Sequence, residues 1–394
     1  MTTATPLDDE RPAIDGGRPV FPDGLPLARP AVADPAAVAE AAGAILASGV
    51  LTNGPYVRRL EERAAAYLGV RHCVAVASCT AGLMLSLRAS NLSGDVVLPS
   101  FTFSASAHAV AWNGLRPVFT DIRPDDLLLD PDAVARSAGV RTSAIRATHT
   151  YGTPCDVEAL GAFARRNGIR LFFDAAHAFG SRRGPTMVGG FGDAEVFSLS
   201  PTKVLIAGEG GLVATHDAEL AHTLRLGRDY GNPGDYDCLF AGLNARMSEL
   251  HAATALASFE DLEERIGLRN QLAERYRKVL ADAPGIDFPA VAEGDRSTYK
   301  DFTILIDPER FGMDAAATAA ALAAEGIQTR RYYSPPVHRQ RAYRWVGPAN
   351  GGLPETDRAA ARVLTLPLWT PMTDEQVDGV GAAMARLAGR QGRG

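Results

Sequence analysis

Lysine is scarce in this chain, because only three of its 40 basic residues are lysines: Lys203, Lys278 and Lys300. Arginine therefore supplies nearly all of the positive surface charge. Any chemistry that needs a primary amine has only these three side chains to draw on.

Cysteine is also sparse, and the four residues Cys73, Cys79, Cys155 and Cys238 show no CxxC spacing, which excludes a disulfide scaffold. The chain lacks an uninterrupted apolar run of about 18 residues, so no membrane-spanning helix is expected. Its first residues carry neither a basic region nor an apolar one, so we expect a cytoplasmic protein. The formal net charge of -6 argues against nucleic-acid binding.

Several catalytic motifs are missing as well. The sequence contains no GxGxxG, GxxxxGK[ST], HExxH or GxSxG segment, so dinucleotide, P-loop, zincin and hydrolase sites have no local support. The eight histidines show no spacing typical of metal ligands, and we expect no metal.

The chain does contain a regular alternation of short apolar runs and helical segments. This pattern predicts an α/β fold with a large domain whose mostly parallel sheet lies between helices. The last two runs are separated by about a dozen residues without a clear helix, so one of them is expected to be antiparallel. The seven predicted strands are 73–78, 96–99, 117–122, 144–150, 170–174, 196–199 and 212–215.

The length of 394 residues predicts more than one domain. We expect an N-terminal arm over 1–30, a large domain over 31–260 and a smaller C-terminal α/β domain over 261–394. A long helical region over 246–284 is expected to connect them. The small domain is predicted to hold strands near 302–306 and 328–331 and helices near 315–325 and 374–387.

Three polar segments follow predicted strands, at the sheet edge where open α/β sheets bind ligands. Small residues around Thr80 leave the N–H groups of a helix N-terminus open to a phosphate. Asp174 closes a buried strand, and His177 follows it. Lys203 lies between Ser198 and a Gly-rich turn, where burial would lower its pKa and favour Schiff-base formation with an aldehyde. By contrast, Lys278 is predicted on a solvated helix face and Lys300 at the charged start of a strand.

Together these segments form the set that pyridoxal 5′-phosphate (PLP) requires. A cradle holds the phosphate, an amine holds the aldehyde, and a carboxylate keeps the pyridine nitrogen protonated so that the ring accepts electrons. The order of the motifs resembles the DegT/DnrJ/EryC1/StrS aminotransferases, which are fold-type I PLP enzymes. The resemblance covers roughly 45–380 and is carried by residues 51–55, 77–83, 98–103, 119–122, 174–180, 197–203, 208–211 and 243–249.

The resemblance implies roles for particular residues. Lys203 matches the Schiff-base lysine, Asp174 the partner of the pyridine nitrogen, and His177 a residue close to the cofactor ring. The remaining implied cofactor contacts are Thr80, Ala81 and Ser198 at the phosphate, Phe103 stacked on the ring, and Asn244 and Arg246 reaching into the neighbouring subunit of a homodimer with shared active sites.

Other positions are less constrained. Cys79 stands where the family commonly has glycine, and a Cβ there is expected to restrict the backbone near the phosphate. Two loops are candidates to meet the substrate, and their residues are Arg228, Tyr230, Asn232, Tyr332, Tyr333 and His338.

The implied activity is transfer of an amino group from L-glutamate or L-glutamine, through PLP and pyridoxamine phosphate (PMP), to a keto sugar or cyclitol. The sugar is expected to be nucleotide-linked, as in amino-sugar, antibiotic or polysaccharide biosynthesis. Two alternatives remain: another PLP reaction, such as dehydration or aromatisation of an aminocyclohexenone precursor, and a non-catalytic regulatory relative. Lys203 argues against the dehydratases of this family, which have histidine there.

Overall fold

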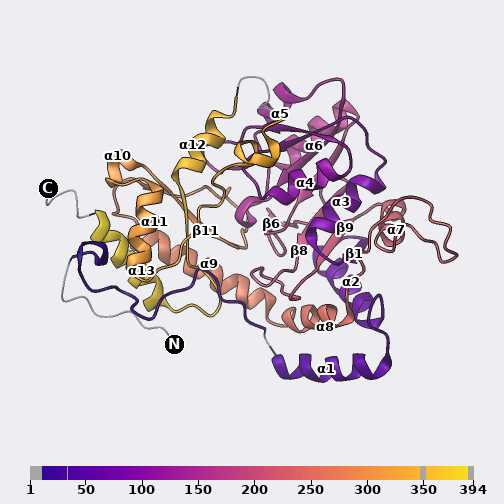
Figure 1. The fold of residues 1–394 in the computed structure, drawn as a ribbon, viewed down its shortest axis with the longest axis horizontal. Coiled ribbons are helices and arrows are strands. Elements are labelled where there is room, and N and C mark those ends of the chain that lie inside the picture. Colours follow the sequence, from indigo (N-terminus) through magenta and orange to yellow (C-terminus); the bar gives the residue numbers. More distant parts are fainter. Residues whose placement is uncertain (1–10, 33, 347–351, 389–394) are drawn as a thin grey trace.

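A seven-stranded sheet forms the centre of the larger part of the molecule (Figure 1). The computed structural model describes residues 11–32, 34–346 and 352–388. The strand order is β1-β9-β8-β5-β4-β2-β3. The strands are β1 (His72–Val76), β2 (Asp95–Pro99), β3 (Arg116–Thr120), β4 (Thr142–Thr148), β5 (Arg170–Asp174), β8 (Ala194–Ser198) and β9 (Gly211–Thr215).

The directions of these strands confirm the predicted sheet. Strand β9 runs antiparallel to both of its neighbours, β1 and β8, while the other pairs are parallel. Every residue of β8 and β9 is buried, as expected for central strands with helices on both faces. The helices of this part are α1 (Pro35–Ser48), α2 (Pro55–Leu68), α3 (Cys79–Ala89), α4 (Ser104–Trp112), α5 (Pro131–Ser137), α6 (Val157–Asn167) and α7 (Ala218–Gly227).

The start of α2 is stabilised from a distant part of the sequence. Its N-cap residue, Gly54, has no side chain to accept hydrogen bonds from the first turn. The buried carboxylate of Glu249 does so instead, accepting from the backbone N–H groups of Gly54, Tyr56 and Val57 at 2.8–2.9 Å. A negative charge at a helix N-terminus also complements the helix dipole.

The connection to the C-terminal part consists of two helices, α8 (Glu249–Ser258) and α9 (Leu262–Val279), so the prediction of one helical region over 246–284 is wrong. The helices are separated at Phe259–Asp261. Arg265 binds across the break, donating to the Ser258 hydroxyl at 2.9 Å and pairing with Asp261 at 3.0 Å. Arg265 also donates to the carbonyl of Ser258, so the last carbonyl of α8 has a side-chain partner.

A three-stranded antiparallel sheet forms the core of the smaller part, with the order β10 (Ile286–Asp287), β11 (Phe302–Ile306), β12 (Val363–Leu366). The strand predicted over 328–331 is absent here: the chain makes single bridges, from Arg330 to Thr365 and from Ile327 to Leu25. Strand β12, which was not predicted, takes the place beside β11. The helices are α10 (Pro308–Phe311), α11 (Ala315–Ala324), α12 (Pro354–Arg362) and α13 (Asp374–Ala388).

Part of the predicted arm packs on this smaller sheet. Residues 1–10 lie outside the described residues, but Val20, Phe21 and Leu25 are buried in the same core cluster as β11, α11 and α13. The buried carboxylate of Glu325 accepts from the N–H groups of Ala13 and Val20, at 2.8 and 3.0 Å. These contacts tie the described part of the segment to the C-terminal helices.

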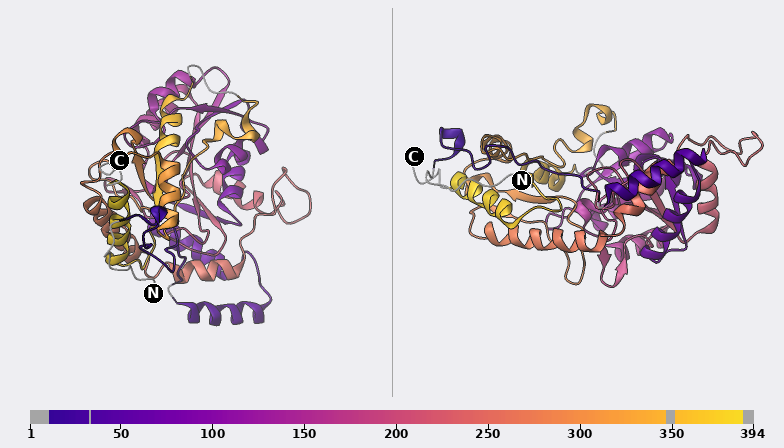
Figure 2. Two further views of the ribbon diagram at one scale, coloured as in Figure 1. Left: turned by 60° about the vertical axis from the view of Figure 1, so that its left-hand side comes forward. Right: turned by 90° about the horizontal axis from the view of Figure 1, so that it is seen from below.

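The loop between α7 and α8 extends away from the body of the molecule, as both views in Figure 2 show. It carries the exposed side chains of Tyr230, Tyr236 and Leu239. Over the described ranges, the structure has no helix long and apolar enough to cross a membrane.

Candidate active site

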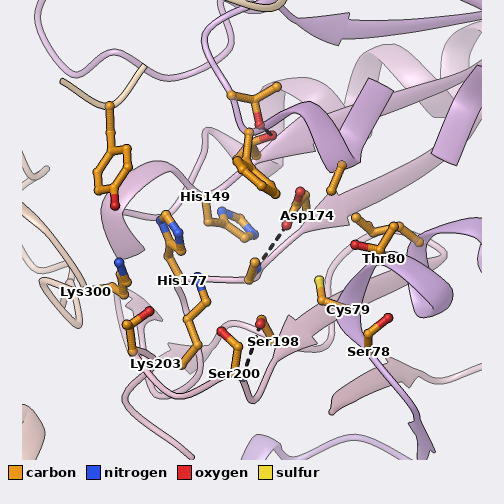
Figure 3. Close-up of a pocket in the computed structure, with 18 of the residues that line it drawn as sticks. Ser78, Cys79, Thr80, His149, Asp174, His177, Ser198, Ser200, Lys203 and Lys300 are labelled. Atoms are coloured by element: carbon orange, nitrogen blue, oxygen red, sulfur yellow. Dashed lines mark hydrogen bonds between the residues drawn. The ribbon is translucent and has the colours of Figure 1, made fainter. Parts of the chain in front are cut away.

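A cavity of about 290 Å³ opens at the edge of the sheet where the parallel strands end (Figure 3). Two walls enclose it. One wall comes from the ends of β1, β2, β4, β5 and β8 and the segments after them, and the other from two segments of the C-terminal part. The first wall includes Ser78, Cys79, Thr80, Phe103, His149, Asp174, His177, Ser198, Ser200 and Lys203, and the second Lys300, Asp301, Tyr332 and Tyr333.

The N-terminus of α3 forms one end of the cavity. The Ser78 hydroxyl caps this helix by accepting from the N–H of Ala81 at 3.1 Å, and Thr80 lines the cavity. A Cβ on Gly211 would lie 2.7 Å from the backbone nitrogen of Cys79, so only glycine lets β9 start this close to the turn. A helix N-terminus with hydroxyl groups beside it is a binding site for a phosphate.

Cys79 is the first residue of α3, so its backbone is helical and does not need glycine. The expectation that its Cβ restricts the backbone near the phosphate stays a prediction. Burial raises the pKa of the Cys79 thiol well above its ordinary value, and the nearby Asp174 carboxylate adds to this rise. The thiol is a neutral lining group.

Asp174 ends β5 and is 4% exposed. Its carboxylate accepts from the Ser106 hydroxyl at 2.5 Å and from the N–H of Ala176 at 3.1 Å. The fully buried Arg146 donates to the carbonyl of Leu83 at 2.9 Å, and burial lowers its pKa to about 10, an effect that Asp174 opposes. The carboxylate is thus held in one orientation at the floor of the cavity.

Lys203 lies in the loop between β8 and β9 and points into the cavity (Figure 3). Desolvation by the surrounding protein lowers its pKa to about 8, and the positive charge of Lys300 acts in the same direction. The neutral, nucleophilic fraction of this amine near neutral pH is therefore much larger than that of an ordinary lysine. The structure thus places the amine, the carboxylate of Asp174 and the helix N-terminus around one cavity.

The other predicted residues of this wall also lie at the cavity. Ser198 ends β8, and Phe103 lines the opening with a side chain that is 60% exposed. His177 lies beside Lys203 and Lys300 (Figure 3), and its pKa is well below the ordinary value because of burial and these two positive charges. His177 is therefore a neutral imidazole.

The second wall contains residues that sequence analysis missed. Lys300 was predicted at the charged start of a strand, yet it lines the cavity and pairs with Asp301 at 2.7 Å. The scarcity of lysine in the sequence is the feature that could have identified Lys300 as a site residue. Tyr332 and Tyr333 join this wall, as the sequence proposed for the loop that holds them.

His149 is a second residue that was missed. It follows β4, it is fully buried, and its ring stacks on Phe173 with 4.8 Å between centroids. Its Nε2 lies 3.0 Å from a carboxylate oxygen of Glu195, and its Nδ1 accepts from the N–H of Cys155 at 2.9 Å. His149 could have been identified as a site residue because it lies near the end of a predicted strand, where open α/β sheets bind ligands.

Some predicted residues do not line the cavity of this chain. Asn244 and Arg246 lie at the base of the extended loop, where Arg246 pairs with Asp229 and lies over the ring of Tyr230 at 5.3 Å. Asn232 caps its own loop by accepting from the N–H groups of Gly234 and Tyr236. Ala81 contributes its N–H to the helix cap described above.

Two of the tentative substrate contacts have other partners. Arg228 is buried at the end of α7 and donates to Glu61 at 2.5 Å and to the carbonyl of Ala75 at 2.7 Å. His338 lies 2.7 Å from the hydroxyl of Ser100 and 3.2 Å from Asp357. Neither lines the cavity, because carboxylates on neighbouring elements hold both side chains elsewhere.

Comparison with known proteins explains this arrangement. The model of the DegT/DnrJ/EryC1/StrS aminotransferase family matches residues 34–385. The chain belongs to this family. The predicted fold type and transaminase activity are thereby confirmed.

Relatives of several kinds match over most of their length. The spore coat polysaccharide biosynthesis protein SpsC of Bacillus subtilis is 34% identical over 85% of this chain and 90% of its own. The dTDP-4-amino-4,6-dideoxy-D-glucose transaminase of Escherichia coli is 32% identical over 82% and 88%.

Solved structures agree with this assignment. The structure of DesI with its TDP-sugar product has a TM-score of 0.91, 40% identity and 97% coverage of both chains. The structure of S. venezuelae DesV with a ketimine intermediate has a TM-score of 0.85 and 34% identity, covering 90% of this chain and 94% of its own. Family membership implies PLP or PMP as the cofactor.

Proposed function

We propose that this aminotransferase binds PLP in the cavity and transfers an amino group from L-glutamate or L-glutamine to the keto carbon of a nucleotide-linked sugar. The arrangement of Lys203, Asp174 and the N-terminus of α3 around one cavity is the observation that carries this proposal. The sugar substrate is supported by relatives whose names specify a dTDP-amino sugar and a TDP-sugar product.

The residues present fit the cofactor. The close approach of Gly211 to Cys79 leaves the start of α3 open for the phosphate, with Thr80 and Ser198 beside it. Asp174, oriented by Ser106, would pair with the protonated ring nitrogen, and Phe103 would cover the ring. When bound, PLP supplies an electron sink that stabilises a carbanion at the donor's Cα.

Lys203 has two tasks in this chemistry. Its amine would hold the cofactor covalently between turnovers and would be free once a donor amine is bound. The freed amine, with its lowered pKa, then moves the proton from the donor's Cα, acting first as a base and then as an acid. His177 lies beside this amine as a neutral imidazole and adds no further positive charge to it.

A direct test is to incubate the purified protein with PLP, reduce it with borohydride and map the modified side chain by mass spectrometry. We expect one adduct, on Lys203, and release of 2-oxoglutarate when the holoenzyme is mixed with glutamate alone. An adduct on Lys278, or no adduct, would contradict the proposal. The half-reaction separates a transaminase from both alternatives, because only a transaminase accumulates PMP and then passes the amino group to a keto sugar.

We also propose a homodimer in which each chain completes the other's cavity. Support comes from the extended loop with Asn244 and Arg246 at its base, and from α1, whose flank exposes Leu46, Val50 and Leu51. Mixing inactive Lys203→Ala protein with inactive Arg246→Ala protein should restore activity, because a hybrid dimer then contains one complete site. Absence of recovery after confirmed subunit exchange would argue against shared sites.

A further inference from the structure

A buried ion pair on the second wall faces the cavity and has no task in holding the cofactor. Lys300 and Asp301 are 8% and 6% exposed, and Nζ of Lys300 lies 2.7 Å from Oδ1 of Asp301. In Figure 3, Lys300 lies near Lys203 and His177, across the cavity from Ser78 and Thr80. The pair is therefore close to the reactive amine and far from the phosphate end.

The backbone that carries this pair is held rigidly. The buried Arg269 of α9 donates to the carbonyls of Tyr299 at 2.9 Å and Lys300 at 2.6 Å. The N–H of Lys300 donates to the carbonyl of Tyr151 at 3.0 Å, in the loop after β4. The two charged groups are thus fixed relative to both walls before any ligand binds, which is the property of a preorganised binding site.

One oxygen of the pair is unsatisfied. Within the described residues, Oδ2 of Asp301 has no hydrogen-bond partner although it is buried, and it lies 3.9 Å from Nδ1 of His177, which also has none. Buried polar atoms without partners are uncommon, and in a cavity they mark the position of a ligand group. The ammonium of Lys300, which carries three donors, has further capacity beside this acceptor.

A hydroxyl group is the ligand that matches this arrangement. It accepts from the Lys300 ammonium and donates to the Asp301 carboxylate in the same place. A carboxylate would satisfy Lys300 but would bring a second negative charge against Asp301, which the neutral His177 does not offset. The pair therefore favours the sugar over the carboxylate of the amino donor.

We propose that Lys300 and Asp301 form the subsite that selects the keto sugar, by binding the hydroxyl on the carbon next to the one that receives the amino group. The inference rests on the proposed function and adds the specificity-determining residues. The adjacent carbon is the relevant one because the keto carbon would have to meet the cofactor's amino group beside Lys203, and Lys300 lies near Lys203.

The test compares two substrates that differ only in this hydroxyl: dTDP-4-keto-6-deoxy-D-glucose and its 3-deoxy analogue. The wild-type holoenzyme should prefer the hydroxylated sugar in kcat/KM by about 5- to 150-fold, the cost of leaving a buried polar group unpaired. In Lys300→Met and Asp301→Asn this preference should fall below about threefold. Calorimetric binding of the corresponding amino sugars should show the same loss of preference.

Two controls separate this role from structural damage. Lys278→Met and Asp282→Asn remove exposed charges of the same types, and they should leave the preference unchanged. The glutamate half-reaction of Lys300→Met and Asp301→Asn, measured on its high-pH plateau, should stay within about threefold of wild type, which also shows that both variants fold and bind the cofactor.

The outcomes are distinct. If both variants retain the wild-type preference, or if they lose the glutamate half-reaction rather than the preference, the subsite is overturned, and the second result points to a donor carboxylate instead. Wild-type turnover of both sugars at equal rates also overturns it while leaving the proposed function intact. Wild-type protein that accepts neither sugar from PMP overturns this inference, whereas the proposed function is overturned by the absence of the Lys203 adduct or of the glutamate half-reaction.

Discussion

The two walls of the cavity differ in how the chain builds them. The first wall is made at the ends of buried strands, where Asp174 and Ser198 follow apolar runs and Thr80 lies in the first turn of a helix. The second wall comes from irregular segments, around Lys300 and Tyr332, that are fixed by contacts from distant side chains such as Arg269. The groups proposed to hold the cofactor lie at the ends of regular strands, whereas the groups proposed to select the substrate lie in irregular segments fixed by packing.

This difference has a functional counterpart. Changes to the first wall should impair both half-reactions, because both need the cofactor. Changes to the second wall should impair only the reaction with the sugar. The following predictions test that contrast, beginning with the largest effect.

Lys203→Ala should lower turnover with glutamate and a keto sugar by at least about 10²- to 10⁴-fold, because the amine proposed to move the proton is removed. Lys278→Ala, on an exposed helix face, is the matched control and should retain wild-type rates. Steady-state release of 2-oxoglutarate is the measurement. Near-normal turnover by Lys203→Ala would end the proposed mechanism.

Gly211→Ala should weaken PLP binding in the first wall. The new Cβ would meet the backbone of Ser78 and Cys79 at under 3 Å, and overpacking of this kind costs about 1–3 kcal/mol, or roughly 5- to 150-fold in Kd. Gly267→Ala on α9 points into open space and is the control. Fluorescence titration of the apo-protein with PLP gives both constants, and equal values would show that the turn tolerates the methyl group.

The smallest expected effect is that of Lys300, in the second wall, on the pKa of Lys203, in the first wall. The rate at which the apo-protein condenses with PLP should rise with pH and reach half its maximum near the Lys203 pKa of about 8, because only the neutral amine reacts. Lys300 lowers that pKa, so Lys300→Met should move the midpoint to higher pH. Stopped-flow absorbance across pH 6–10 measures it; an unchanged midpoint would show that the two walls are electrostatically independent.

Much of the fold could be predicted because its strands are buried on both faces. All seven strands of the large sheet, and the antiparallel one among them, follow from apolar runs and the spacing between them. The strand expected over 328–331 fails for the opposite reason: that segment pairs only through single bridges, to Leu25 and Thr365, which no local pattern specifies. Likewise, nothing near Arg228 in the sequence reveals that Glu61 holds it.

The candidate site divides in the same way. Lys203, Asp174 and Thr80 could be found because each lies in a motif next to a predictable strand. Lys300 was set aside as a surface charge, since its burial depends on Arg269 and Tyr151, which lie 31 and 149 residues away along the chain. Sequence patterns report a residue's own element, and they are silent about which distant groups surround it.

The reversed direction of β9 has a consequence for how an enzyme of this kind is assembled. If the strand after β8 were parallel to it, a helical crossover would first have to carry the chain back to the end of the sheet where β8 begins. Because β9 instead runs antiparallel beside β8, the twelve residues between Ser198 and Gly211 leave the sheet and return to it at the same end of these two strands. Lys203, the proposed covalent anchor, therefore lies on a short connection between two buried, paired strands, and these strands fix where its amine can reach.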